Sequence, residues 1–305
     1  MNTPLSPFLE KFLHYLQYEK QFSPHTIENY NIDLVKIIRF FDSLAIHDWN
    51  NVEEGHIRAW LSLQRSQKIS TRTLNRQLAA LRSFYRYLIK EGELVDNKAQ
   101  RIISLKSSAS LPKALDVDQM STLLDFDAKT NLEIRDIAIL ELLYSSGLRV
   151  SEIASLNIED IDLSSRQLTV TGKGKKMRVA LIGSHAAIAL TKWLELRKVM
   201  TDPNEKSVFL NKEGQRLSVR SIQNRLYQFG LKQGIAVRVH PHQIRHSFAS
   251  HLLESSNDLR AVQELLGHSN LSTTQIYTKV NFQHLANVYD ECHPRAKKQK
   301  KGEDE

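Results

Sequence analysis

The chain has 305 residues, of which 41% are hydrophobic and 25% charged, a balance typical of proteins that bury a core, and a length that predicts two domains. The 42 Lys and Arg against 34 Asp and Glu give a formal net charge of +8, which favours polyanionic partners such as nucleic acid. No apolar run reaches the roughly 20 residues of a transmembrane helix, and Glu10 and Lys11 interrupt the region where a signal peptide would be apolar, so we expect a cytoplasmic protein without a membrane partner. The single cysteine, Cys292, excludes an intrachain disulfide and a cysteine-based zinc site.

The first hundred residues show helical periodicity in four segments and no convincing alternation. The four predicted helices cover residues 5–20, 24–44, 52–66 and 70–91. The Ser-rich run 104–112, which ends in Pro112, has the composition of a linker. We therefore predict an N-terminal helical domain over residues 1–106 and a linker over 107–112. A second domain would span 113–296, followed by a charged, disordered tail over 297–305.

The fourth predicted helix has one cationic face. Projected at roughly 100° per residue, its basic side chains fall within an arc of about 120°, opposite the apolar ones. The members of this basic face are Arg72, Arg76, Arg82, Arg86 and Lys90. Ordinary solvated faces mix both signs of charge, so the absence of acidic residues from the arc favours binding to DNA phosphates.

The second half is predicted to be mostly helical, with one exception. The helices expected there cover residues 134–145, 186–199, 219–233, 243–253 and 259–266. Between residues 167 and 182, two short alternating stretches flank the turn Gly172-Lys173-Gly174-Lys175, which predicts a β-hairpin with a lysine at its tip.

Four separate places along the second half hold polar residues in an unusual order. They are Arg149 in SGLRVSE, Lys173 on the hairpin, His242 and Arg245 in HPHQIRH, and His268 and Tyr277 in LLGHSNLSTTQIYT. Singly, each has a plain structural interpretation, such as a helix-start cation or a turn lysine. As an ordered set, they resemble the catalytic signature of the tyrosine recombinase family, and within it the Xer subfamily, over nearly the whole chain. Two departures, Ile244 for leucine and Asn257 for glycine, conserve core volume and a left-handed turn respectively.

The resemblance implies a mainly α protein with an N-terminal four-helix SAM-like core-binding domain. The catalytic domain would be mixed α+β, mostly helical with a small antiparallel sheet. It also implies a reaction without metal or other cofactor, which suits the chemistry: charge that builds up on phosphate oxygens must then meet fixed cationic donors, and arginine forks have the right geometry.

The roles implied for individual residues follow the family. Arg149 and Arg245 would clamp the phosphate, and Tyr277 would become a covalent 3′-phosphotyrosine. His242 would assist proton removal, Lys173 would protonate the departing 5′ oxygen, and His268 would donate a hydrogen bond to a phosphate oxygen. Spacing alone does not decide between Lys173 and His242 for each proton transfer.

The resemblance further implies that the enzyme acts on double-stranded DNA at a dif-like chromosomal site. It would assemble with an XerD-like recombinase into a heterotetramer of two plus two, under control of a cell-division DNA translocase, and so resolve chromosome dimers. Two alternatives stay open: a mobile-element integrase, and a DNA-binding regulator without catalysis.

The C-terminal segment carries an apolar stripe. Phe282, Leu285, Ala286 and Tyr289 lie at offsets of three, four and seven residues, as on one face of a helix. We expect the segment 282–295 to dock on a neighbouring recombinase; docking on its own domain would bury the same residues.

Overall fold

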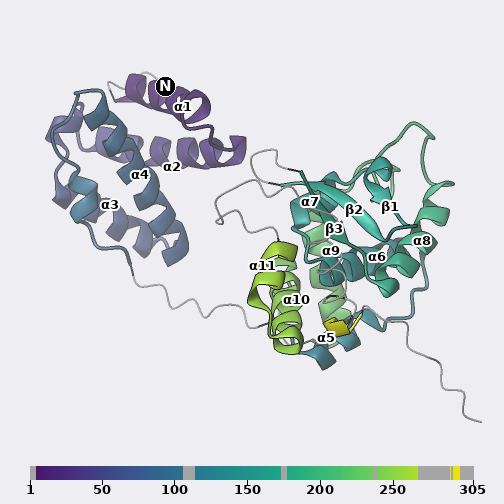
Figure 1. Cartoon of the computed structure of the whole chain (residues 1–305). Helices are drawn as coiled ribbons and strands as arrows, with labels where there is room; N and C mark the ends of the chain where they lie inside the picture. Colours follow the sequence, from purple (N-terminus) through teal and green to yellow (C-terminus); the bar gives the residue numbers. More distant parts are fainter. Residues whose placement is uncertain are drawn as a thin grey trace, which may run out of the picture. The chain divides into compact units, whose positions relative to one another are not determined.

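A computed structural model describes residues 5–105, 114–172, 177–235, 239–266, 289 and 291–295. The chain divides into two compact units, Met1–Ser110 and Leu111–Glu305. Both are built mainly of helices, and the second also holds a small antiparallel sheet (Figure 1), which confirms the predicted fold class. Among the helices so described, none is long and apolar enough to cross a membrane.

Four α-helices and two 3₁₀ turns form the described part of the N-terminal unit. They are α1 (Ser6–Tyr18), α2 (Pro24–Ser43), η1 (Trp49–Asn51), α3 (Glu54–Ser66), α4 (Thr71–Lys90) and η2 (Lys98–Arg101). Serine caps set two of the starts: the Ser23 hydroxyl accepts the Thr26 N–H, and the Ser70 hydroxyl accepts the Thr73 N–H, each at 3.2 Å. The four helices agree closely with the four predicted segments.

Aromatic side chains hold these helices together. Phe84 of α4 contacts Phe12 of α1 edge to face, with ring centroids 5.1 Å apart, and lies 4.9 Å from Trp49 of η1. Phe12 and Phe84 have no exposed surface. Because α4 contributes most of its apolar face to this core, its opposite face is left at the surface.

The second unit is arranged around one buried helix. Its elements are α5 (Val117–Leu124), α6 (Asn131–Ser146), α7 (Val150–Ser155), η3 (Ile158–Asp160), β1 (Ile161–Asp162), β2 (Gln167–Thr171), β3 (Met177–Leu181), α8 (Ser184–Arg197), α9 (Val219–Lys232), α10 (Pro241–Ser256) and α11 (Leu259–Leu266). Helix α6 is buried on nearly every side and contacts α8, α9, α10 and β3. Helices α10 and α11 lie side by side (Figure 1).

The sheet has the strand order β1-β2-β3, with both pairs antiparallel. Strands β2 and β3 pair from Gln167 with Leu181 to Thr171 with Met177, which matches the predicted hairpin. The predicted tip residue Lys173 lies outside the described residues.

Two residues in the left-handed region end helices of this unit. Gly147 ends α6 with φ 55°, and Asn257 ends α10 with φ 54° while its N–H donates to the Leu253 carbonyl at 2.9 Å. The prediction that Asn257 accommodates a left-handed turn is confirmed, since asparagine tolerates this conformation better than most residues.

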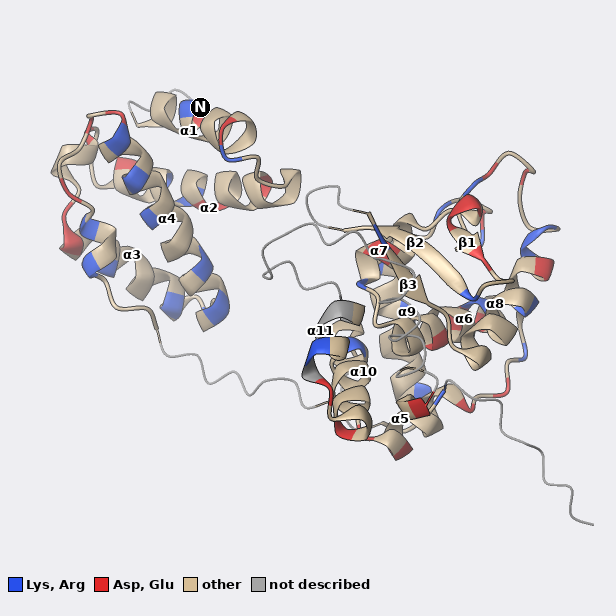
Figure 2. Cartoon of the chain, viewed as in Figure 1, with Lys and Arg blue, Asp and Glu red and all other residues tan. Residues whose placement is uncertain are grey.

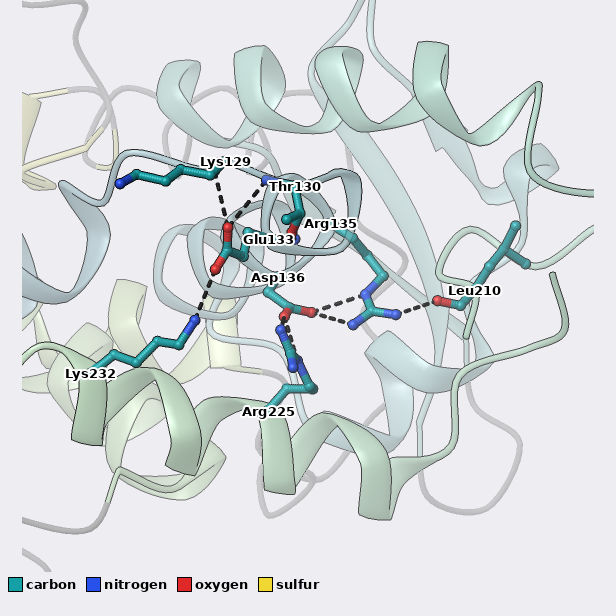
Figure 3. A network of polar contacts seen from close by, with 8 residues as sticks. All are labelled: Lys129, Thr130, Glu133, Arg135, Asp136, Leu210, Arg225 and Lys232. Atoms are coloured by element: carbon teal, nitrogen blue, oxygen red, sulfur yellow. Dashed lines mark hydrogen bonds and ion pairs between the residues drawn. The ribbon is translucent and has the colours of Figure 1, made fainter. Parts of the chain in front are cut away.

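A buried ionic network fixes α9 against α6 (Figure 3). The Arg135 Nε donates to Asp136 Oδ1 at 2.9 Å, and its Nη1 donates to the Leu210 carbonyl at 2.6 Å. From α9, the Arg225 Nε reaches the other oxygen of Asp136 at 2.6 Å. One carboxylate therefore satisfies two guanidiniums and ties the central helix to the helix beside it.

The described end of the C-terminal segment packs on its own domain. Tyr289 is 2% exposed within the core and stacks on His293 with ring centroids 5.0 Å apart. The Arg295 guanidinium donates to Glu141 of α6 at 2.7 Å and to Asp125 at 3.3 Å. Tyr289 and Arg295 therefore contact their own domain, and docking of the segment 282–295 on a neighbouring recombinase stays a prediction. Phe282, Leu285 and Ala286 lie outside the described residues.

Candidate active site

Arg149 occupies the start of α7, directly after the turn that ends α6. Its backbone N–H donates to Glu152 Oε2 at 2.7 Å, and its Nη1 donates to Oε1 of the same carboxylate at 2.9 Å. Glu152 is 2% exposed, whereas the Arg149 side chain is 36% exposed. The carboxylate thus caps the helix and orients the guanidinium, and the arginine still reaches solvent.

Arg245 reaches the same turn from α10. Its guanidinium donates to the carbonyl of Gly147, the residue whose left-handed conformation ends α6. Burial, reinforced by the charges of Arg149 and Arg178, lowers the pKa of Arg245 from its ordinary value to about 10, and the Glu152 carboxylate acts in the opposite direction. Arg149 and Arg245, nearly a hundred residues apart in sequence, therefore lie within electrostatic range of each other.

The structure adds a third arginine, Arg178, which the sequence analysis did not single out. It lies on β3 with 9% of its side chain exposed, and its Nη2 donates to Glu152 Oε2 at 3.1 Å. Its Nη1 donates to the Leu265 carbonyl of α11 at 3.3 Å. Alternation along the predicted strand puts residue 178 on the face of residue 180, but only the structure shows that Ala180, and hence this face, is buried. A charged residue on a buried face requires a partner.

Together, three guanidiniums surround one buried carboxylate. Three positive charges and one negative charge leave a formal local charge of +2, contributed by Arg149, Arg178, Arg245 and Glu152. Burial is the main cause of the lowered pKa of Arg245, and the positive charges of Arg149 and Arg178 lower it further. An anion that binds between Arg149 and Arg245 would supply the missing charge, and fork-shaped donors fit phosphate oxygens.

His242 lies one turn before Arg245. Helix α10 begins at Pro241, so His242 and Arg245 are three residues apart in its first two turns and share a face, as predicted. His242 is exposed. The remaining candidates, Lys173, His268 and Tyr277, lie outside the described residues. Within the described part of the chain, no group of three or more His, Cys, Asp or Glu side chains could hold a metal ion.

The basic face of α4 combines two kinds of arginine, and Figure 2 shows basic positions recurring along this helix. Arg72 and Arg86 are exposed and have no hydrogen bond or ion pair within the part of the chain that the structure describes. By contrast, Arg76 donates to Asn29 at 2.6 Å and to the buried Asp33 at 3.0 Å.

Two further members of the face also have partners in their own unit. Arg82 is half-buried and donates to the carbonyls of Ala99, at 3.1 Å, and of Ile102. Lys90 is exposed and pairs with Glu19 at 2.9 Å. The face therefore holds structural arginines beside ones that remain open to a ligand.

Comparison with known proteins assigns the family. Residues 113–284 match the phage integrase family model, and residues 9–92 match the model of the phage integrase N-terminal SAM-like domain. The chain belongs to the phage integrase family, the tyrosine recombinases, and is a DNA strand-transfer enzyme.

Its curated relatives place it in the Xer subfamily. It is 47% identical to the tyrosine recombinase XerC of Histophilus somni over 96% of this chain and 99% of that protein. With XerC of Proteus mirabilis it shares 46% identity over 97% of this chain and 96% of the relative.

Solved structures agree with the fold. A crystal structure of the XerH site-specific recombinase bound to palindromic difH substrate, a post-cleavage complex, matches with TM-score 0.67 and 26% identity, over 87% of this chain and 79% of that one. A lambda integrase dimer bound to a core site shares the fold with TM-score 0.67 at 18% identity, over 87% of this chain and 95% of that one.

Proposed function

We propose that this recombinase is site-specific and cuts one strand of double-stranded DNA at a time through a 3′-phosphotyrosine at Tyr277. The observation that carries the proposal is the arginine pair Arg149 and Arg245, held beside the α6–α7 turn with more positive than negative charge around it. Such a pair can neutralise a phosphodiester as negative charge grows in the transition state, which supplies most of the catalysis in acyl and phosphoryl transfer.

The chemistry forms one bond and breaks one. The Tyr277 hydroxyl oxygen attacks phosphorus, the bond from phosphorus to the 5′ oxygen breaks, and the departing oxygen takes a proton from Lys173. His242 accepts the tyrosine proton or stabilises its loss, and His268 donates to a phosphate oxygen. In the reverse direction, a free 5′ hydroxyl of another strand attacks the phosphotyrosine. The energy of the phosphodiester is conserved, so neither a metal ion nor a nucleotide cofactor is required.

DNA binding extends to the N-terminal unit. We assign the core of the phosphate-binding surface on α4 to Arg72 and Arg86, because their guanidiniums are exposed and free of internal partners among the described residues. Arg76 and Lys90 lie on the same face and remain exposed, so they add positive charge there while holding Asp33 and Glu19. Arg82, which donates to three groups of its own chain, contributes charge more than direct contact.

The biological reaction follows from similarity over almost the whole length of the XerC proteins. We infer a cytoplasmic enzyme that assembles as two plus two with an XerD-like recombinase at a dif-like site. It passes through a Holliday junction to convert chromosome dimers into monomers before division. A cell-division DNA translocase would control this reaction.

Cleavage of a suicide substrate tests the proposal. A nicked duplex made from the host's candidate dif-like site loses a short fragment after cleavage, so the covalent protein–DNA adduct accumulates and is counted on a denaturing gel. Wild type should form the adduct, more of it when an XerD-like partner is added, and Tyr277→Phe should bind the same duplex without forming any. Adduct formation by Tyr277→Phe would move the nucleophile elsewhere.

The same assay separates the two alternatives. A regulator without catalysis binds the duplex and gives no adduct with wild type. A mobile-element integrase cleaves its own element's ends and leaves the dif-like site uncut. Cleavage of the dif-like site that depends on Tyr277 contradicts both.

A further inference from the structure

Arg178 is held from two sides by acceptors of its own unit. Its two terminal nitrogens are held by Glu152 and by the Leu265 carbonyl, and only 9% of its side chain is exposed. It is therefore poorly placed to bind a phosphate itself, unlike Arg149, which is 36% exposed. Its contribution must pass through the groups that it touches.

Glu152 is the group that Arg178 shares with the clamp. One oxygen, Oε2, accepts from both the Arg149 backbone at 2.7 Å and Arg178 at 3.1 Å, while Oε1 accepts from the Arg149 guanidinium at 2.9 Å. With 2% of its surface exposed, this carboxylate receives little screening from water. Without Arg178, its negative charge would act only on Arg149 and Arg245, the two arginines of the clamp.

We propose that Arg178 is a positioning residue for the phosphate clamp: it neutralises Glu152, so that the carboxylate can orient Arg149 without cancelling its charge. The inference rests on the proposed function of Arg149. It also explains why one carboxylate is buried among cations that attract an anion. The carboxylate orients Arg149, and Arg178 raises the summed charge of Arg149, Arg245 and Glu152 from +1 to +2.

The bond to Leu265 fixes the guanidinium in this orientation. The Leu265 carbonyl of α11 accepts the Arg178 Nη1 at 3.3 Å, and a carbonyl oxygen carries partial negative charge that attracts a cation. With one terminal nitrogen on the Leu265 carbonyl and the other on Glu152, the Arg178 guanidinium is held against the carboxylate. Lysine at this position keeps the charge but cannot donate to both acceptors with the geometry of a fork.

A double-mutant cycle on the full chain tests the inference, with cleavage rates measured on the nicked dif-like duplex. We expect Arg178→Gln to cleave about 10- to 100-fold more slowly than wild type, less than the 10²–10³-fold that loss of a direct oxyanion donor costs. In a Glu152→Gln background there is no carboxylate charge to neutralise, so Arg178→Gln should slow cleavage no more than about threefold. Arg178→Lys should lie between wild type and Arg178→Gln.

Arg166→Gln is the matched control, because it removes an exposed arginine that precedes β2 of the same sheet. It should cleave at the wild-type rate. Noncovalent binding of each variant to the duplex, by gel shift, should change less than its cleavage rate, because the clamp acts most strongly on the transition state.

A neutral scissile group supplies the second measurement. With a methylphosphonate in place of the scissile phosphate, Arg149 has less negative charge to neutralise. On this substrate the cleavage rate of Arg178→Gln should therefore lie within about threefold of the wild-type rate. This comparison carries the test if Glu152→Gln alone abolishes cleavage. Equal losses for Arg178→Gln in both backgrounds, equal losses on both substrates, or a wild-type rate on phosphodiester would each overturn the inference. If wild type forms no adduct with either duplex, the proposed function itself fails, and the inference with it.

Discussion

Arg76 gives the sharpest test of which residues on the basic face of α4 stabilise the fold and which bind DNA. Its guanidinium donates at 3.0 Å to Asp33, a carboxylate with no exposed surface, while 41% of the Arg76 side chain remains exposed. Burial raises the pKa of Asp33, and the charge of Arg76 opposes that rise. Removing Arg76 therefore leaves a buried carboxylate without its main cation.

The magnitude follows from burial. Breaking a fully buried ion pair by removing one partner costs about 3–5 kcal/mol. Since water already reaches Arg76, we take about 2 kcal/mol for Arg76→Ala. With a urea dependence of about 1–3 kcal/mol per molar, the unfolding midpoint of the N-terminal unit should fall by about 1 M. The loss should grow as pH rises, because a carboxyl with a raised folded pKa stabilises the fold at low pH and loses that contribution as it ionises.

Tryptophan fluorescence during urea unfolding of the full chain measures this, since two of the three tryptophans, Trp49 and Trp60, lie in the N-terminal unit. Asp33→Asn added to Arg76→Ala should recover at least half of the loss, because the amide carries no charge to leave unpaired. The matched control is Arg72→Ala with Arg86→Ala, which should leave the midpoint unchanged.

The salt dependence of DNA binding tests which residues of the basic face contact phosphates. The Arg72→Ala, Arg86→Ala pair should lower the slope of log K against log salt by about 1.8, about 0.9 for each lost phosphate contact. Arg76→Ala should change this slope by less than about 0.9, the value for one phosphate contact. If Arg76→Ala unfolds at the wild-type midpoint while its slope falls by about 0.9, the reasoning is refuted and Arg76 is a phosphate ligand.

Three more predictions concern the catalytic unit. Burial raises the pKa of Glu141 to about 7, so this carboxyl stabilises the fold fully below about pH 4.5, and about 3 kcal/mol of that stabilisation is lost as pH rises through 7. The melting temperature should therefore decline between pH 5 and 8, and Glu141→Gln should flatten the decline. An unchanged profile in the variant would mean that another group titrates. Asp136→Ala should lower the free energy of unfolding in urea by about 3–5 kcal/mol, because Arg135 then stays buried without its carboxylate. Arg225→Ala should lower it by about 1 kcal/mol or less, because the Arg225 side chain is partly exposed. Similar losses for both variants would contradict the network drawn in Figure 3. Strand cleavage should persist in excess chelator, and a loss that added magnesium restores would contradict the reaction proposed for Tyr277.

Long amphipathic helices were predictable because their periodicity records which side faces the core. The sequence predicted α2 and α4 almost to the residue. It did not predict α7 or β1, which have six and two residues and are too short to show a period. Helix α7 depends on the capping box between Arg149 and Glu152, a contact that periodicity does not record.

Periodicity was also limited for the basic face. It placed Arg82 opposite the core, but the segment around η2 packs against α4 there, and the carbonyls of Ala99 and Ile102 accept from the guanidinium. A helical projection shows which residues turn away from the core of one helix; it cannot show which other segment covers them. Arg178 was missed for a related reason: a strand pattern predicts which face a residue lies on, but not which groups it contacts.

The pairing of Arg149 with Arg245 depends on a turn that neither residue makes. Gly147 adopts a left-handed conformation, so the chain leaves α6 sharply, its carbonyl receives Arg245 from α10, and Arg149 follows two residues later at the start of α7. Burying Arg245 beside this turn, with Arg149 near it, disfavours its charged form and lowers its pKa. A bound anion opposes both effects, because its negative charge stabilises the charged guanidinium. The site is thus more favourable with a phosphate present than without one, and it is most favourable when the phosphate carries the additional charge of a transition state.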